Sequence, residues 1–100
     1  MIFVLRTTAG REKQVVDKII AIAKKHDNIY SVLSPAEVRG YVFVEADNRS
    51  DVQQAVYGVP HVKGVIEGNG LNVALVRIGR KLLIDEEKFF QWINEQQEGR

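Results

Sequence analysis

Hydrophobic and polar positions follow two different periods along the first two thirds of the chain. Residues 2–6 form a short apolar run, and residues 41–46 place successive side chains on opposite faces, so both segments are predicted strands. Between them, residues 11–26 carry apolar side chains at intervals of three and four, which predicts an amphipathic helix. Residues 29–33 and 62–66 are predicted to be two further strands.

A second helix is predicted to begin at Ser50. Because Gln53 follows three residues later, the two side chains match a capping box, in which each satisfies a backbone N–H at the start of the helix. Gly58 and Pro60 are expected to end this helix. The predicted order is βαββαβ, which is typical of a ferredoxin-like α+β sandwich.

The remaining segment is predicted to add a β-hairpin and a helix to this fold. Residues 72–78 and 81–84 are the predicted strands, and Gly79 at the first central position suits a type II′ turn. Asp85 is the expected cap of the C-terminal helix. The broad apolar face of that helix is predicted to consist of Phe89, Phe90, Trp92 and Ile93.

Length and composition favour one globular domain over residues 1–100. A chain of 100 residues builds one hydrophobic core but not two. Its 45% hydrophobic and 27% charged residues are typical of a folded domain. No stretch approaches the roughly 20 apolar residues of a membrane span, and the first residues lack the layout of a signal peptide. A cytoplasmic protein without membrane contact is therefore expected.

Net charge and residue types limit the kinds of binding and catalysis that this chain can carry out. With 14 Lys+Arg against 13 Asp+Glu, the net charge of +1 provides no long-range attraction for nucleic acid. The absence of cysteine excludes disulfides and thiolate zinc sites. The two histidines, His26 and His61, lie far apart and match no metal-binding or catalytic spacing. We therefore expect no enzyme, no cofactor and no metal.

Residues 39–46 allow two interpretations. Together with the first predicted strand, they resemble the paired sheet motifs of an RNA-recognition motif, in which Tyr41 and Phe43 would stack on bases. Two positions depart from that motif, because Val42 stands where a small residue is usual and Ala46 where an aromatic residue is expected. The alternative that the aromatic residues only cover a half-buried sheet stays open.

A second resemblance extends over residues 1–67. Four blocks are similar, in order and spacing, to the N-terminal (NGN) domain of archaeal NusG-family transcription elongation factors. The blocks are TTAGREK at 7–13, YSVLSPAE at 30–37, RGYVFVEA at 39–46 and GVPHVKGV at 58–65. Because four blocks in register are more specific than one short motif, this family is preferred over the RNA-recognition motif.

The resemblance implies a protein-binding function in which no bond is made or broken. Domains of this family dock on the clamp coiled coil of the large RNA polymerase subunit and promote processive elongation. Their docking surface is an apolar depression on the sheet, and the matching positions in this sequence are Val4, Tyr41 and Phe43. Aromatic anchors in a concave patch are typical of interface hot spots.

The resemblance also implies a second partner. In archaea the family pairs with a small zinc-binding subunit that extends the sheet from its edge through main-chain hydrogen bonds. The contact is expected along the fourth predicted strand, at Val62, Gly64 and Ile66. It stays equally open that this segment is an ordinary edge or central strand.

After residue 67 the sequence departs from this family. Residues 73–97 resemble the wing hairpin and following helix of an excisionase-type winged-helix protein, without its recognition helix. The abrupt change favours an engineered chimera, which would have no selected function, over a natural domain with an unusual hairpin. Arg77, Arg80 and Lys81 would contact phosphates as a wing does, although three cations predict only weak nucleic-acid binding. A solvated turn is the favoured alternative.

Overall fold

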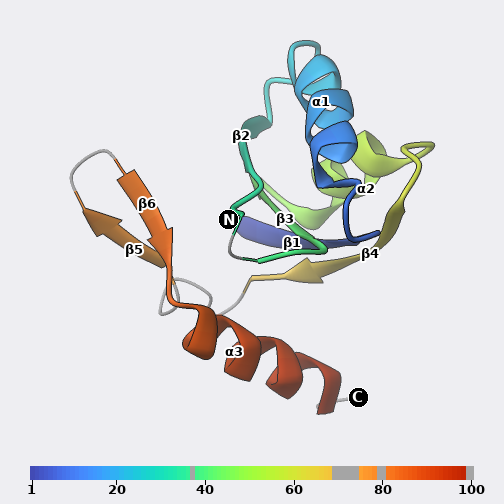
Figure 1. The fold of residues 1–100 in the computed structure, drawn as a ribbon. Coiled ribbons are helices and arrows are strands. Elements are labelled where there is room, and N and C mark those ends of the chain that lie inside the picture. Colours follow the sequence, from blue (N-terminus) through green and yellow to red (C-terminus); the bar gives the residue numbers. More distant parts are fainter. Residues whose placement is uncertain (37, 69–74, 79–80, 99–100) are drawn as a thin grey trace. The chain divides into compact units, whose positions relative to one another are not determined.

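The computed structural model describes residues 1–36, 38–68, 75–78 and 81–98. The chain divides into two compact units, an N-terminal unit (Met1–Gly68) and a C-terminal unit (Asn69–Arg100). The expectation of a single domain over all 100 residues stays a prediction. In chain order the helices and strands are β1 (Ile2–Thr7), α1 (Glu12–Ala23), β2 (Ile29–Leu33), β3 (Tyr41–Ala46), α2 (Arg49–Val56), β4 (Val62–Glu67), β5 (Leu75–Ile78), β6 (Lys81–Ile84) and α3 (Glu86–Glu98) (Figure 1).

The N-terminal unit is a four-stranded antiparallel sheet with α1 and α2 on one face (Figure 1). Its strand order is β2-β3-β1-β4, so β1 lies inside the sheet, between β3 and β4. Helix α1 contacts β2 and β3, whereas α2 contacts β3 and β4. The element order and this sheet confirm the predicted ferredoxin-like α+β fold.

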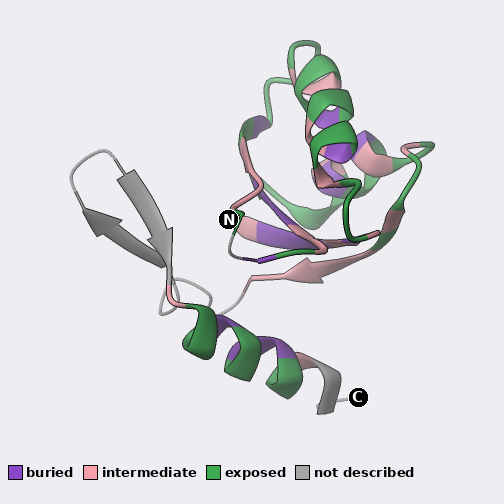
Figure 2. Cartoon of the chain, viewed as in Figure 1, coloured by how far each residue is buried: buried purple, intermediate pink, exposed green. Residues whose placement is uncertain are grey.

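The core of the N-terminal unit lies between the sheet and the two helices (Figure 2). Phe3 and Leu5 of β1 face Val44 and Val42 of β3, respectively, and all four are buried. Alternation along each strand brings these side chains to the same face, as the sequence pattern predicts. The other members of the core cluster are Val15, Ile19, Ile29, Ala46, Val52 and Ala55.

Helix α1 follows a tight turn at its start and ends where its apolar face ends. Gly10 has φ +89°, which glycine adopts without strain, and it lies in the turn between β1 and the helix. The helix ends at Ala23, before the expected end at residue 26. The N–H groups of Lys25 and His26 instead bond to carbonyl oxygens three residues back. Both side chains are exposed, so no burial favours a further helical turn.

The predicted capping box of α2 is wrong. The helix begins before Ser50, and its cap is Asn48, whose side-chain oxygen accepts a hydrogen bond from the N–H of Asp51 over 3.0 Å. Asparagine is among the best N-capping residues, and Asn48 has the extended backbone that a cap requires. The hydroxyl of Ser50 accepts a 3.4 Å hydrogen bond from the side chain of Gln54 instead.

Both outer strands of this sheet contain a bulge. In β4 the extra residue is Lys63, because its two neighbours along the strand face consecutive residues of β1. In β2 the extra residue is Tyr30, because its neighbours face consecutive residues of β3. A bulge leaves one residue out of the ladder and bends the strand. The straight part of β4 is therefore limited to residues 64–67.

The C-terminal unit contains the predicted hairpin. Strands β5 and β6 pair antiparallel, from Leu75 opposite Ile84 to Ile78 opposite Lys81. This register leaves two residues between the strands, as predicted. The type II′ turn at residues 79–80 and the first part of the predicted strand, residues 72–74, lie outside the described residues.

Helix α3 begins at the predicted cap, where the carboxylate of Asp85 accepts a hydrogen bond from the N–H of Lys88 over 3.0 Å. Phe89, Trp92 and Ile93 are buried, whereas Phe90 is 41% exposed. The apolar face is narrower than predicted, because it does not include Phe90. No helix in the described part of the chain is long and apolar enough to cross a membrane.

Candidate functional site

The three predicted docking residues lie on the sheet face opposite α1 and α2. Val4 of β1 pairs directly with Phe43 of β3, and Tyr41 follows two residues earlier on the same face of β3. Val4 also faces Ile66 of β4, so the apolar surface continues across three strands. Val4 and Phe43 are 0% and 4% exposed, and Tyr41 is half-buried. The structure therefore brings the predicted trio together.

One buried apolar residue outside the core cluster was not revealed by sequence periodicity. Val38 is fully buried, although it precedes β3 and belongs to no helix or strand. Its N–H donates a 3.2 Å hydrogen bond to the carbonyl of Pro35, which forms a turn. Val4, Val38 and Phe43 are buried without belonging to the core cluster beneath the helices. A single valine in a loop carries no periodic signal, so its burial could not be predicted.

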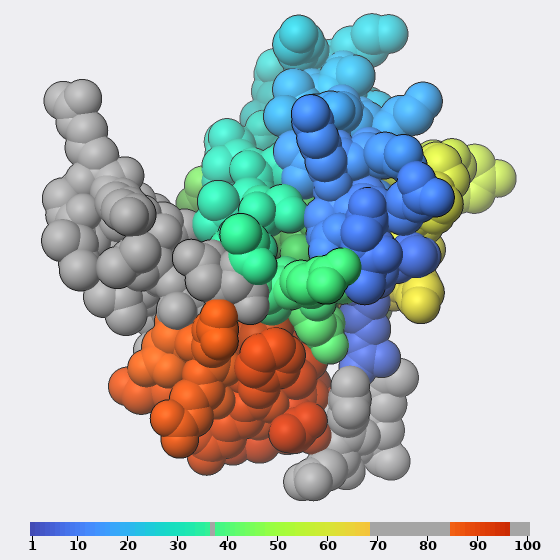
Figure 3. Space-filling model, in the orientation of Figure 1, coloured from blue at the N-terminus to red at the C-terminus, as the bar shows by residue number. Residues whose placement is uncertain are grey.

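The peptide units of Gly40 hold the start of β3 in place. The N–H of Gly40 donates a 2.8 Å hydrogen bond to the carboxylate of Glu12, in the first turn of α1. The carbonyl of Gly40 accepts a 2.8 Å hydrogen bond from the N–H of Thr7. Figure 3 shows this green segment against the blue start of α1. These two bonds fix the backbone immediately before Tyr41, and thus the direction in which the docking strand begins.

The same contact makes Glu12 more acidic. The hydrogen bond from the N–H of Gly40 is the largest cause, and the bonds from the N–H groups of Glu12 and Gly10 and the charge of Arg39 add to it. Together they lower the pKa of Glu12, because they favour the ionised carboxylate. Burial opposes this effect only weakly, since the residue is partly exposed.

The lowered pKa predicts a pH-dependent stability of the N-terminal unit. A depressed carboxylate pKa stabilises the fold above the ordinary pKa of glutamate, and that stability is lost as the pH falls through the folded value. Glu12→Gln should remove this dependence and cost up to about 1 kcal/mol at pH 7, since a solvent-accessible carboxylate contributes little. Urea unfolding at pH 7 and pH 3 measures both effects. Equal pH dependence in the two proteins would contradict the assignment.

The predicted partner-binding residues Val62, Gly64 and Ile66 lie on β4, which is an outer strand of the four-stranded sheet. Val62 precedes the bulge at Lys63, whereas Gly64 and Ile66 lie in the straight part of the strand. Of the alternatives left open by the sequence, the structure selects an edge strand. In the described part of the chain β4 pairs with a strand on one side only, which is the arrangement that an added strand requires.

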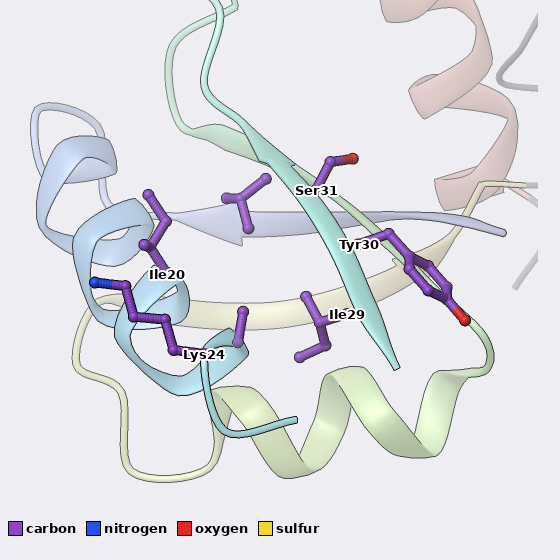
Figure 4. A pocket seen from close by; sticks show the side chains of 7 residues that line it. Ile20, Lys24, Ile29, Tyr30 and Ser31 are labelled. Atoms are coloured by element: carbon purple, nitrogen blue, oxygen red, sulfur yellow. The ribbon is translucent and has the colours of Figure 1, made fainter. Parts of the chain in front are cut away.

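A shallow pocket of about 260 Å³ lies between the end of α1 and β2 (Figure 4). Ile20 of the helix and Lys24, which follows it, line one side, and Ile29 of the strand lines the other. The hydroxyl of Tyr30 donates a 2.7 Å hydrogen bond to Asp47, and this bond is the largest cause of the raised pKa of Tyr30. The pocket is mostly apolar and contains no arrangement of acid, base and nucleophile.

The residues considered for catalysis and for nucleic-acid contact belong to other segments of the chain than the docking residues on β1 and β3. His26 and His61 are exposed, and His61 has φ +73°, with its carbonyl accepting a 3.0 Å hydrogen bond from the N–H of Thr8. Among the described residues, no three His, Cys, Asp or Glu side chains gather to hold a metal. In the hairpin, Arg77 pairs with Leu82 and Lys81 with Ile78, while Arg80 lies outside the described residues.

Comparison with known proteins matches the N-terminal unit. Residues 1–74 match the Spt5-NGN family, described as the NGN section of the early transcription elongation factor of RNA pol II. Transcription elongation factor Spt5 of Methanocaldococcus jannaschii is 38% identical over 69 residues, which cover 68% of this chain and 47% of that protein. The chain thus spans about half the length of this relative.

Two solved structures from the same organism have the same fold. A crystal structure of a heterodimer complex with Spt4 aligns with a TM-score of 0.64 and 38% identity, covering 68% of this chain and 82% of that one. The N-terminal domain of NusG (NGN) aligns with a TM-score of 0.63 and 38% identity, covering 68% and 86%. The predicted resemblance over residues 1–67 is confirmed, and the chain belongs to the Spt5-NGN family of transcription elongation factor domains.

Proposed function

We propose that this chain docks on the clamp coiled coil of the large RNA polymerase subunit and promotes processive elongation without catalysing a reaction. The observation that carries this proposal is the direct pairing of Val4 with Phe43 on the sheet face opposite α1 and α2, next to Tyr41. These are the positions that the family resemblance selects. A clamp of two helices presents apolar side chains that such a surface can bury.

The three residues of this surface differ in exposure. Val4 and Phe43 are almost fully buried, whereas Tyr41 is half-buried. Tyr41 is therefore the first residue to test, because its substitution changes the least of the internal packing. Its backbone is already fixed by the two hydrogen bonds of Gly40.

Substitution of Tyr41 by alanine should weaken binding to an isolated archaeal clamp coiled coil by at least about tenfold, the usual effect of an aromatic hot spot. Binding is measured by NMR titration of the labelled domain. Tyr57→Ala is the matched control, because Tyr57 is 89% exposed at the end of α2 and lies outside the proposed surface. Equal affinities of the two variants would refute this surface. Tight binding of single-stranded RNA at physiological salt would favour the RNA-recognition interpretation instead.

The edge of β4 is the proposed site of a second partner, a small zinc-binding subunit of the Spt4 type. Support comes from the outer position of β4 and from the structural similarity to a chain that forms a heterodimer complex with Spt4. Because Lys63 interrupts the ladder, the added strand would pair with residues 64–67. Val62 would then lie at the end of the contact rather than within it.

A further inference from the structure

The free side of β4 is defined by the bonding pattern with β1. The N–H of Gly68 donates a 2.8 Å hydrogen bond to the carbonyl of Ile2. Bonded and non-bonded pairs alternate in an antiparallel ladder. The pairs of Val65 with Leu5 and of Glu67 with Phe3 are therefore non-bonded, so that the backbone groups of Val65 and Glu67 point away from β1. These are the groups that an added strand would have to reach.

One of these groups is already occupied by a side chain from α2. The Nη2 atom of Arg49 donates a 3.2 Å hydrogen bond to the carbonyl oxygen of Val65. The Nη1 atom of the same guanidinium lies 3.8 Å from a carboxylate oxygen of Glu67. Arg49 thus contacts two groups at the free edge, the carbonyl oxygen of Val65 and the carboxylate of Glu67, which lie two residues apart in the strand. Both charged side chains are partly exposed, at 46% and 38%, so the contact is open to competition from water.

Gly64 lies in the straight part of β4, next to Val65. A Cβ added to Gly64 would meet no atom within 4 Å, and its φ is not positive. Neither packing within the N-terminal unit nor backbone strain requires glycine there. Glycine in a strand often marks a place where a second backbone comes close.

We propose that Arg49 is a removable cap on the edge of β4, which yields to an extended strand of the partner subunit. With the cap in place, the Val65 carbonyl is unavailable to a second strand, as expected for a protected sheet edge. Strand addition then requires that the guanidinium leave this carbonyl, which becomes a ladder acceptor. The inference rests on the partner site proposed above and adds the residue that regulates it.

The test compares Arg49→Ala with Arg11→Ala, which removes an equal charge from an exposed residue at the start of α1. Spt4 of Methanocaldococcus jannaschii is the probe, and affinity is measured by calorimetry. Arg49→Ala should bind about threefold to fivefold tighter than the unaltered chain, the range expected when one exposed hydrogen bond and one exposed ion pair no longer compete. Arg11→Ala should bind like the unaltered chain. Weaker or unchanged binding of Arg49→Ala would overturn the cap.

A second measurement tests the hydrogen bond between Arg49 and Val65 in the absence of any partner. The ¹³C shift of the Val65 carbonyl should change in Arg49→Ala and stay constant in Arg11→Ala, because only the first variant loses the hydrogen bond. A constant shift in both variants would overturn the inference even if Spt4 binds. If instead the carbonyl shift changes but Spt4 perturbs no residue of 64–67, the hydrogen bond from Arg49 is confirmed, but the proposed partner site fails and the role of Arg49 in strand addition fails with it. The two failures are therefore distinguishable.

Discussion

Phe3→Ala is expected to lower the free energy of unfolding of the N-terminal unit by about 3–5 kcal/mol. The Phe3 side chain is fully buried and faces Val44 inside the core cluster. Alanine removes the apolar surface of the ring and leaves a cavity that the central strand cannot close, because β1 is held by strands on both sides. Urea unfolding followed by far-UV circular dichroism measures the loss.

Tyr57→Ala is the control for this substitution, because it also removes an aromatic ring but from a residue that is 89% exposed. Its unfolding free energy should stay within about 0.5 kcal/mol of that of the unaltered chain. If Phe3→Ala cost as little as Tyr57→Ala, Phe3 would not lie in the core and the register between β1 and β3 would be wrong.

Gly40→Ala is expected to cost about 1–2 kcal/mol, because Gly40 has φ +84°, a left-handed conformation that strains any residue with a Cβ. Space is not the cause, since the added Cβ would lie 3.5 Å from the Thr7 carbonyl, an ordinary contact. Relief of the strain would disturb the hydrogen bonds to Glu12 and Thr7. The variant should therefore also bind the clamp coiled coil more weakly than its stability loss explains.

Gly64→Ala is the matched control, since Gly64 has no positive φ and open space around its Cα. Alanine there should leave stability unchanged or raise it slightly, because glycine in a strand is the less stable choice. The comparison thus separates backbone strain from side-chain volume. Equal costs at the two positions would show that the left-handed conformation of Gly40 is not needed.

Sequence patterns predicted the elements well where alternation was regular. The strands at residues 29–33 and 41–46 have the predicted boundaries, since two-residue periodicity and flanking turn residues act locally. The start of α2 was missed because two good caps stand close together, and only the extended backbone of Asn48 decides between it and Ser50. The end of α1 was missed because polar residues with good helix propensity follow its apolar face.

The site was predictable only through the family resemblance. Alternation in β3 placed Tyr41 and Phe43 together, but nothing local indicated that Val4 would be paired with Phe43. The contacts that arrange the site join distant segments, such as the bond from Gly40 to Glu12, across 28 residues. The hydrogen bond from Arg49 to Val65 joins residues that are 16 positions apart in the sequence, and it depends on how α2 lies against β4. Such contacts follow from the packed sheet and not from a sequence pattern.

The position of β1 inside the sheet affects how the protein forms during synthesis. β1 leaves the ribosome before the other strands of its sheet, but its neighbours in the sheet are β3 and β4, and β3 is complete only about 40 residues later. At typical translation rates that interval is roughly 2–8 s. Throughout it, the apolar residues Ile2 to Leu5 of β1 have neither partner strand. The nascent chain therefore exposes this aggregation-prone segment for seconds. Chaperone contact near the ribosome would protect it until β3 emerges.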